Sequence, residues 1–427
     1  MAKAKSKKIT LEEALVPAEE QPYEVPENWC WIHLLDSFDN VTDSKKKLAT
    51  KEYLEDGEYP IVDQGQDFIG GYTDDADMIY DGELPIVIFG DHTRCIKYID
   101  FQFAQGADGV KVLKPKQFWN DKAFYYAMQS IEIPNMGYRR HYPLFKDFCI
   151  PLPPLAEQKR IVEQIESLFA KLDEAKEKAL SVVESFELRE KAIYKKAFEG
   201  DLTNSWRAEN GINISEWEEI PFEKLGKLER GRSKHRPRND KRLFGGKYPF
   251  IQTGDVAGAG MYVTSHKQTL SEFGFEQSRM FPKGTLCITI AANIGDAAIL
   301  SYDCCFPDSV VGFTPGEKCL NKYMYFYLQE IKAELEYIAP ATAQKNLNLK
   351  LLGKVEIKVP SLKEQEKIVE ILEMQINDQE NIVEKAENVI ETIDVMKKSI
   401  LAKAFRGELG TNIETEESAI ELLKSIF

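Results

Sequence analysis

The sequence predicts an α+β protein with two β-rich globular domains separated by two long antiparallel coiled-coil helices, arranged as an internal pseudo-two-fold repeat. Three observations support this fold class. The chain has 427 residues, too many for one ordinary core, and its 43% hydrophobic and 11% aromatic content is that of a globular protein. Two segments repeat at a constant separation, and in both the apolar residues recur at helical spacing. The predicted order is a domain over 1–150 with a tail at 1–20, a helix over 151–203, a second domain over 204–356, a helix over 357–410, and a tail over 411–427.

The repeat is the clearest feature of the chain. Residues 150–163, which read IPLPPLAEQKRIVE, align with residues 357–370, IKVPSLKEQEKIVE, at an offset of 207 positions. The same offset places KAFEGDL at 196–202 on KAFRGEL at 403–409, and about 21 identities fall in roughly 54 aligned positions. Two unrelated polar helices would not match at both ends with one offset. The chain therefore contains a duplication.

Each repeated segment is predicted to be a helix that buries one face against the other copy. Apolar residues recur at steps of three and four with charged flanks, as in a heptad seam. Prolines precede both segments, and Gly200 and Gly407 follow them, where glycine takes the left-handed conformation. Each helix would have about 42 residues and a length of about 60 Å. The seam positions are Ile161, Ile165, Leu168, Leu172, Ala175, Ala179, Val182, Phe186 and Ile193 in the first copy, and Ile368, Leu372, Ile376, Ile382, Val383, Ala386, Val389, Ile390, Ile393, Met396 and Ile400 in the second.

The segments before the helices repeat more weakly. Residues 59–62, YPIV, resemble residues 248–251, YPFI, and a strand-like run at 84–90 has a counterpart at 284–290. Short β-branched runs broken by Gly, Asp and Asn are typical of strands. Diverged domains joined to similar helices suggest two related modules that recognise different things.

Composition excludes several classes of protein. No apolar run reaches the roughly 18 residues of a membrane span, and the lysine-rich start lacks the apolar stretch of a secretory signal. The seven cysteines are scattered and form no C-x-x-C pair, which favours reduced thiols in a cytoplasm over disulfides or structural zinc. The net charge of −15 argues against a nucleic-acid partner, but binding depends on the local face, and the basic residues are clustered.

Two motifs resemble a known family. The Pro-x-x-x-Glu-Gln-x-x-Ile-Val opening at 153–162 and again at 360–369, with a globular domain before each, is similar to the specificity subunits of type I restriction–modification enzymes. FGDHTR at 89–94, followed by GADGV at 106–110, resembles a segment of the family's recognition domains. The second half departs there, with AANIG at 291–295 and FPDSV at 306–310, which argues against a shared base readout but not against a shared fold. The resemblance covers roughly residues 20–410.

This resemblance implies a non-catalytic subunit that reads a split, asymmetric double-stranded DNA target, one part for each domain. The helices would set the spacing between the parts and dock two methyltransferase subunits. Those subunits would bind S-adenosylmethionine and methylate adenine, and restriction and translocase subunits would supply the ATP- and Mg-dependent steps. The chain itself would bind no cofactor.

The candidate DNA contacts are side chains of the types that bond base edges and phosphates. In the first half these form a glutamine loop, a turn after an apolar strand, and a basic segment with interleaved tyrosines before the helix. In the second half, eight basic side chains crowd into the 13 positions of 230–242, and amide side chains gather elsewhere. The first set is Gln64, Gln66, His92, Thr93, Arg94, Tyr138, Arg139, Arg140 and His141, and the second is Arg230, Arg232, Lys234, Arg236, Arg238, Gln252, Thr253, Asn293, Gln344, Lys345 and Asn346.

Two other classes of function remain open from the residues alone. One is a non-catalytic coiled-coil scaffold whose domains bind proteins, although such a scaffold has no need of the basic stretch at 230–242. The other is an enzyme in its own right, for which the sequence offers no Asn/Asp-Pro-Pro-aromatic, H-E-x-x-H or G-x-S-x-G motif.

Overall fold

The structure is a computed structural model that describes residues 10–106, 109–339 and 347–426. The chain forms two compact units, the first made of Met1–Ala179 with Asn388–Phe427 and the second of Leu180–Glu387. The division falls within both long helices and not at their ends. Each unit therefore holds one β-rich domain together with part of each helix.

The first domain is built on a four-stranded sheet with the order β2-β8-β5-β6 and a three-stranded sheet with the order β4-β3-β7. The central strand β5, Ile86–Gly90, is buried throughout because both of its faces are covered. Val87 and Phe89 pack in the core that includes Phe124 of the helix α2, and Ile86 and Ile88 pack in a second core against the smaller sheet. The other elements are β2 Phe38–Asn40, β8 Val110–Pro115, β6 Ile96–Ile99, β4 Gly71–Thr73, β3 Tyr59–Val62, β7 Ala104–Gln105, α2 Asp121–Ser130 and α1 Leu11–Ala14.

The second domain repeats this plan. Its sheets have the orders β11-β19-β16-β17-β13 and β14-β12-β18-β15, and the central strand β16, Leu286–Thr289, is again buried on both faces. The other strands are β11 Gly226–Arg230, β19 Val310–Pro315, β17 Ala297–Leu300, β13 Tyr262–Val263, β14 Gln268–Leu270, β12 Phe244–Phe250, β18 Cys304–Cys305 and β15 Met280–Phe281. The helices are α5 Asn204–Asn210, α6 Phe222–Leu225, α7 Thr253–Ala257, α8 Glu272–Glu276, α9 Asn321–Glu330, α10 Lys332–Ile338 and α11 Leu349–Gly353.

Each domain also has a two-stranded sheet where its chain enters and leaves. In the first domain β1, Cys30–His33, pairs with β9, Cys149–Leu152, and in the second β10, Glu218–Pro221, pairs with β20, Glu356–Val359. These pairs lead directly into the long helices. The matching sheet orders, the matching root strands and the matching helices α2 and α9 confirm the predicted internal repeat and fold class.

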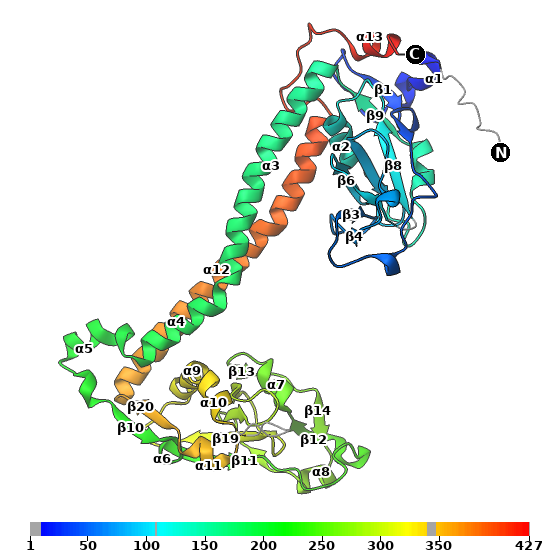
Figure 1. Ribbon diagram of the computed structural model, residues 1–427. Coiled ribbons are helices and arrows are strands. Elements are labelled where there is room, and N and C mark those ends of the chain that lie inside the picture. The colour runs from blue at the N-terminus through cyan, green and yellow to red at the C-terminus, as the bar shows by residue number, and fades with distance from the viewer. Residues whose placement is uncertain (1–9, 107–108, 340–346, 427) are drawn as a thin grey trace. The chain divides into compact units, whose positions relative to one another are not determined.

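The long helices run antiparallel, as predicted. Lys176 bonds Asp394 at 2.8 Å and Lys397 bonds Asp173 at 2.5 Å, so positions that rise along one helix fall along the other. Figure 1 shows these two helices, α3 and α12, side by side. The predicted ends are also confirmed, because Gly200 and Gly407 follow the helices with φ of +90° and +75°.

The first long helix differs from the prediction in being interrupted. It consists of α3, Leu155–Glu184, and α4, Phe186–Phe198, whereas α12, Leu362–Ala404, is continuous over 43 residues. The break lies at Ser185, whose hydroxyl donates to the Ser181 carbonyl at 2.7 Å. Arg189 donates to the Val182 carbonyl at 2.9 Å. Side chains that bond the preceding turn in this way compete with the helical ladder and bend it.

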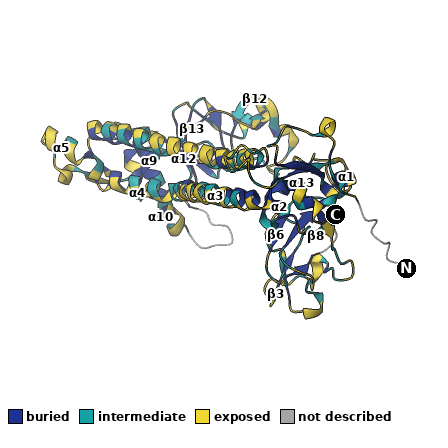
Figure 2. Cartoon of the chain, turned by 90° about the horizontal axis from the view of Figure 1, so that it is seen from above, coloured by how far each residue is buried: buried dark blue, intermediate teal, exposed yellow. Residues whose placement is uncertain are grey.

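The seam is also less closed than the heptad pattern predicted. Ile161, Ile165, Ile368, Leu372 and Ile393 are buried. However, Ala175 is exposed, and Ile382, Val389 and Met396 retain 44 to 45% of their side-chain exposure. Two helices can cover one row of side chains, and the adjacent row needs a further partner. The exposed residues along α3 and α12 contrast with the buried sheets in Figure 2.

The repeated Glu-Gln pair fastens each domain to its helix. Gln158 donates to the carbonyls of Phe118 and Pro153, and Gln365 donates to those of Lys318 and Pro360, all at 2.8 to 3.0 Å. All four Glu and Gln side chains are fully buried. Their role in each unit is therefore to hold the domain root.

The two glutamates accept hydrogen bonds from different partners. Glu364 accepts from Trp217 at 3.0 Å and from Arg207 at 2.7 Å, a buried ion pair. Glu157 accepts from Trp29 at 2.7 Å and from Asn412 at 2.8 Å. We refer to these two arrangements as the Glu157 latch and the Glu364 latch.

The predicted C-terminal tail is an integral part of the first unit. Helix α13, Ala419–Lys424, buries Ala419 and Leu423 in the core of the first domain. The two terminal guanidinium nitrogens of Arg160 donate to the Glu416 carboxylate, the shorter bond at 2.7 Å. These bonds hold the pKa of Glu416 below its usual range. The Ala419 amide donates to the Asn28 carbonyl at 2.9 Å. The last segment of the chain is thus packed against its first domain.

Candidate nucleic-acid interface

The first domain brings most of its predicted residues together in loops around the end of β5. The side-chain oxygen of Gln64 accepts the His92 amide at 3.1 Å, and the Thr93 hydroxyl donates to the Gln64 carbonyl at 2.5 Å. Gly109 completes this contact, because its φ is +90° and a Cβ there would lie 2.5 Å from Gln64 Oε1. Gln64 and Thr93 therefore join two loops and fix the turn that carries His92.

His141 is not available to DNA, which corrects the prediction for this residue. Its side chain is fully buried, with Nδ1 bonded to the Asp91 carbonyl at 2.9 Å and Nε2 accepting the Met136 amide at 3.1 Å. The buried Asp91 carboxylate in turn accepts the Tyr142 amide at 2.7 Å. His141 and Asp91 thus shape the loop before β9 from inside, as buried polar groups with bonded partners do.

The same loop exposes the residues best placed to meet a ligand. Tyr138 keeps 88% of its exposure and stacks on the ring of His92, with centroids 4.8 Å apart and an interplanar angle of 12°. Arg139 and Arg140 follow it and are exposed. Neither forms an ion pair with any residue that the structure describes. A preformed aromatic stack beside two arginines without carboxylate partners suits a phosphate-bearing, planar ligand.

Lys97 supports this surface from inside and was not singled out by the sequence. Its ammonium group is almost fully buried and donates to the Asp63 carbonyl at 2.9 Å and the Asp67 carbonyl at 2.5 Å. Burial lowers the pKa of Lys97, and the nearby Asp63 carboxylate partly opposes this shift. Lys97 thereby anchors the loop that carries the exposed Gln66. It stands in an alternating strand sequence, and no sequence signal distinguishes it from a solvent-facing lysine.

Arg94 lies at the base of this surface. Its backbone is left-handed, with φ of +63°, and its guanidinium donates to the Ile133 carbonyl at 3.0 Å. This bond ties the turn after β5 to the segment after α2. Arg94 therefore has a structural partner, and its remaining donors are half-buried.

In the second domain the basic loop, residues 231–242, follows strand β11. Its start is fixed by main-chain bonds from Gly231 to Val310 at 2.8 Å and from Arg232 to Phe306 at 3.1 Å. A Cβ on Gly231 would lie 2.2 Å from the Pro307 carbonyl oxygen, so only glycine permits this approach. The loop is thus held against the segment that carries Asp308.

Two carboxylates form ion pairs with several of the basic side chains of the loop. The two carboxylate oxygens of Asp308 accept from Nη2 of Arg238, at 2.8 and 2.9 Å, and the carboxylate lies 4.0 Å from Arg236. The main-chain carbonyl of Asp308 accepts from Arg230. Asp240 bonds Arg242 and His235, which hold the pKa of Asp240 well below its usual range. Arg232, Lys234 and Lys241 form no ion pair within the described part of the chain. The predicted cluster is therefore real but partly neutralised.

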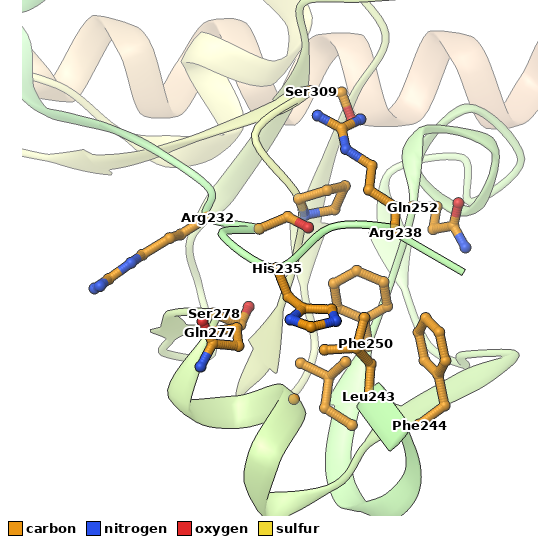
Figure 3. A pocket seen from close by; sticks show the side chains of 14 residues that line it. Arg232, His235, Arg238, Leu243, Phe244, Phe250, Gln252, Gln277, Ser278 and Ser309 are labelled. Atoms are coloured by element: carbon orange, nitrogen blue, oxygen red, sulfur yellow. The ribbon is translucent and has the colours of Figure 1, made fainter. Parts of the chain in front are cut away.

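A pocket of about 120 Å³ lies beneath this loop. Leu243, Phe250 and Leu270 supply its apolar side, and Arg238, Gln252 and Ser309 are among its polar lining residues. Figure 3 shows His235 beside Leu243 and Phe250, whereas Arg232 extends away from them. The structure therefore places Gln252, one of the predicted amide contacts, at the same pocket as residues of the basic loop. The Gln252 amide nitrogen is bonded to Gln268 at 2.8 Å.

The remaining predicted residues of the second domain are more scattered. Thr253 begins α7 beside Gln252, and Asn293 lies exposed in the turn between β16 and β17. Gln344, Lys345 and Asn346 lie outside the described residues.

The described residues contain no group of three or more His, Cys, Asp or Glu side chains suited to hold a metal ion. Among the same residues, no helix is long and apolar enough to span a membrane. The cysteines at 287, 304, 305 and 319 are buried in the second domain, and burial raises the pKa of Cys304 and Cys319 to about 12.

Two copies of one β-rich fold, each with arginine-bearing loops and each rooted on a long helix by a buried Glu-Gln pair, define a duplicated nucleic-acid-recognition protein. Residues 26–185 and 214–392 both match the family described as the type I restriction modification DNA specificity domain. The chain therefore belongs to this family. It is a type I specificity subunit, a non-catalytic component of a restriction–modification system, and nothing in the comparisons favours a protein-binding scaffold.

Individual relatives are distant in sequence. The type I restriction enzyme EcoBI specificity subunit of Escherichia coli is 25% identical over 357 residues, which cover 72% of this chain and 71% of that protein. A chain from a study of complex assembly and conformational transition in the type I restriction–modification system has 18% identity and a TM-score of 0.64, and it covers 91% of this chain and 100% of its own. The HsdS subunit from Thermoanaerobacter tengcongensis has 17% identity and a TM-score of 0.58, with 92% and 100% covered. At these identities the solved structures support the fold alone.

Proposed function

We propose that each β-rich domain reads one half of a bipartite, asymmetric target in double-stranded DNA. The observation that carries this proposal is the combination of one fold with two different loop sets. The sheets and roots repeat in the same order, but the first domain presents Tyr138, Arg139 and Arg140, whereas the second presents the basic loop at 231–242. Shared scaffolds with unlike polar loops are suited to reading unlike sequences.

The long helices are proposed to set the spacing between the half-sites and to dock two methyltransferase subunits. Linked domains face one side of a duplex best when their half-sites are about one turn, ~34 Å, apart. Each unit leaves apolar side chains exposed on its helical part, namely Val389, Val395 and Met396 in the first and Leu188, Met374 and Ile382 in the second. Large apolar side chains left exposed on helices favour a further protein partner. Their presence in both units fits two copies of that partner.

The cofactors of the complex are proposed to reside on the partner subunits. S-adenosylmethionine would bind the methyltransferase subunits, and ATP and Mg would serve restriction and translocase subunits, with the assembly acting on DNA in the cytoplasm. This chain would contribute sequence selection.

Methylation mapping tests the proposal directly. The full chain, combined with its methyltransferase partner and S-adenosylmethionine, should methylate adenine within one bipartite sequence when a genomic library is supplied as substrate. Sequencing of the methylated positions gives the target and its gap. Methylation without a fixed sequence would contradict the proposal.

A binding experiment separates DNA reading from a protein-binding scaffold. Affinity of the assembled complex for duplex DNA should fall steeply as salt rises, because cations on the loops displace counterions from phosphates. An affinity for duplex that is independent of salt would favour the scaffold.

A further inference from the structure

Asp308 in the second domain lies beside two arginines of the basic loop. Both carboxylate oxygens of Asp308 accept from one nitrogen, Nη2, of Arg238, at 2.8 and 2.9 Å, and the carboxylate also lies 4.0 Å from Arg236. The two arginines remain 53 to 55% exposed in spite of this contact, so solvent and ligands can reach them. A guanidinium bonds carboxylate and phosphate oxygens through the same N–H donors, so the two anions compete for it.

The loop does not depend on the Asp308 side chain for its attachment. Its backbone is bonded from Gly231 to Val310, from Arg232 to Phe306 and from Lys234 to Gln277. Arg230 bonds the main-chain oxygen of Asp308, which any residue would supply. The carboxylate therefore acts on the charge of the loop more than on its path.

The first domain has no equivalent arrangement at its exposed arginines. Arg139 and Arg140 face solvent without a carboxylate partner among the described residues. The nearby Asp91 is buried and is used by the Tyr142 amide. Any effect of Asp308 should thus be confined to the half-site that the second domain reads.

We propose that Asp308 is a specificity-determining residue that holds Arg236 and Arg238 away from DNA until a matching half-site offers contacts that replace it. This inference rests on the proposed DNA-reading function. On unmatched DNA a phosphate must compete with the Asp308 carboxylate for these arginines, so the gain from phosphate contacts is small. On the matching half-site, the additional base contacts offset the loss of the Asp308 pair.

The test compares D308N with E218Q in the full chain assembled with its methyltransferase partner. Glu218 lies on β10, pairs with Lys318 at 2.9 Å, and gives the same charge change away from the basic loop. Binding to a short duplex of random sequence is measured over a range of salt concentrations, and methylated adenines are mapped on genomic DNA.

D308N should bind random duplex roughly threefold to tenfold more tightly than the wild type, because a partly exposed ion pair no longer competes. Its salt dependence should steepen by about one to two phosphate contacts. Methylation should spread to sites that differ from the target in one half only, and R238Q combined with D308N should remove most of the gain in affinity. E218Q should behave as the wild type.

Three results would overturn the inference. D308N could match E218Q in affinity and fidelity, it could lose affinity for all duplexes, which would make the carboxylate a support for binding, or its fidelity could relax equally in both halves. A wild-type complex that methylates no defined bipartite sequence would instead contradict the proposed function. The two failures are therefore distinguishable.

Discussion

Tyr138 and His141 stand three positions apart on one loop of the first domain, and their side chains have opposite surroundings. Tyr138 is 88% exposed and lies flat on His92, whereas His141 is fully buried between the Asp91 carbonyl and the Met136 amide. The buried histidine fixes the loop that presents the tyrosine. The conformation of this candidate site therefore depends on a polar interior as much as on its exposed groups.

Replacing Tyr138 with alanine should weaken binding of the complex to its specific duplex by roughly 1 kcal/mol, about a fivefold rise in Kd, because an aromatic contact is lost. Unfolding should be unchanged, since the ring is exposed. Tyr337→Ala is the matched control, because Tyr337 is 89% exposed in the second domain and is not among the predicted contacts. Equal Kd values for Y138A and the wild type, measured by fluorescence anisotropy, would exclude Tyr138 from the interface.

At the residue scale, the sequence predicted which loops carry clustered polar side chains, because such clusters are local in the chain. The aromatic and basic pattern at 138–142 falls on an exposed loop of the first domain, and the cations at 230–242 gather in one loop of the second. The burial of His141 is set by Asp91, which is 50 positions away in the chain, and the anchoring by Lys97 is set by carbonyls 30 to 34 positions away. Contacts over such separations leave no local signature. Whether the candidate residues touch DNA stays a prediction.

At the scale of elements, the two latches show how one motif serves two different environments. Glu364 neutralises a buried arginine, Arg207, whose side chain is only 5% exposed. Glu157 receives neutral donors from Trp29, Thr411 and Asn412. The same residue type in the same position of the repeat thus carries different electrostatic weight.

This difference predicts unequal effects of the same substitution. E364Q should destabilise the second unit by roughly 3–5 kcal/mol, because it leaves the buried Arg207 charge without its partner. E157Q should cost the first unit about 1 kcal/mol, since a glutamine still accepts from neutral donors. Hydrogen exchange at the root strands β10 and β1 reports each unit separately. Similar losses in both variants would show that the ion pair is not what distinguishes the latches.

The helices were the most predictable elements, because periodicity and capping residues are local. Their starts after prolines and their ends at Gly200 and Gly407 follow the sequence pattern. The break at Ser185 could not be predicted, since serine also occurs within helices and its bond to the preceding turn is only one of its options. The sheet orders could not be predicted either, because they depend on pairings between distant strands.

At the scale of the whole molecule, the segment that follows each long helix bonds the glutamate of one Glu-Gln pair. After α4, Thr203 and Arg207 meet Glu364, and after α12, Thr411 and Asn412 meet Glu157. Residues 411–412 in the first unit and residues 203–207 in the second therefore have the same role, because each bonds the buried glutamate of its unit. The duplication therefore includes the connections as well as the domains.

Lengthening both long helices tests whether they set the target spacing. Adding about one turn, ~4 residues, to α3 within 170–181 and a matching turn to α12 within 391–400 should widen the non-specific gap between the half-sites, as read from mapped methylation. The paired insertion keeps contacts such as Lys176 with Asp394 in register. An insertion in α3 alone should instead shift this register and lower stability. A gap of unchanged length in the paired variant would show that something other than the helices sets it.

The latches also bear on how such a protein can change over generations. In each unit the glutamate bonds one tryptophan, Trp29 or Trp217, and the glutamine beside it bonds main-chain carbonyls of the domain, and these bonds do not involve the loops that differ between the domains. The stretch from Trp29 to α3 and the stretch from Trp217 to α12 are therefore domains attached through the same types of residue. Recombination with end points at these attachment residues would exchange one domain in one step and leave the attachment residues, the long helices and the other domain unchanged.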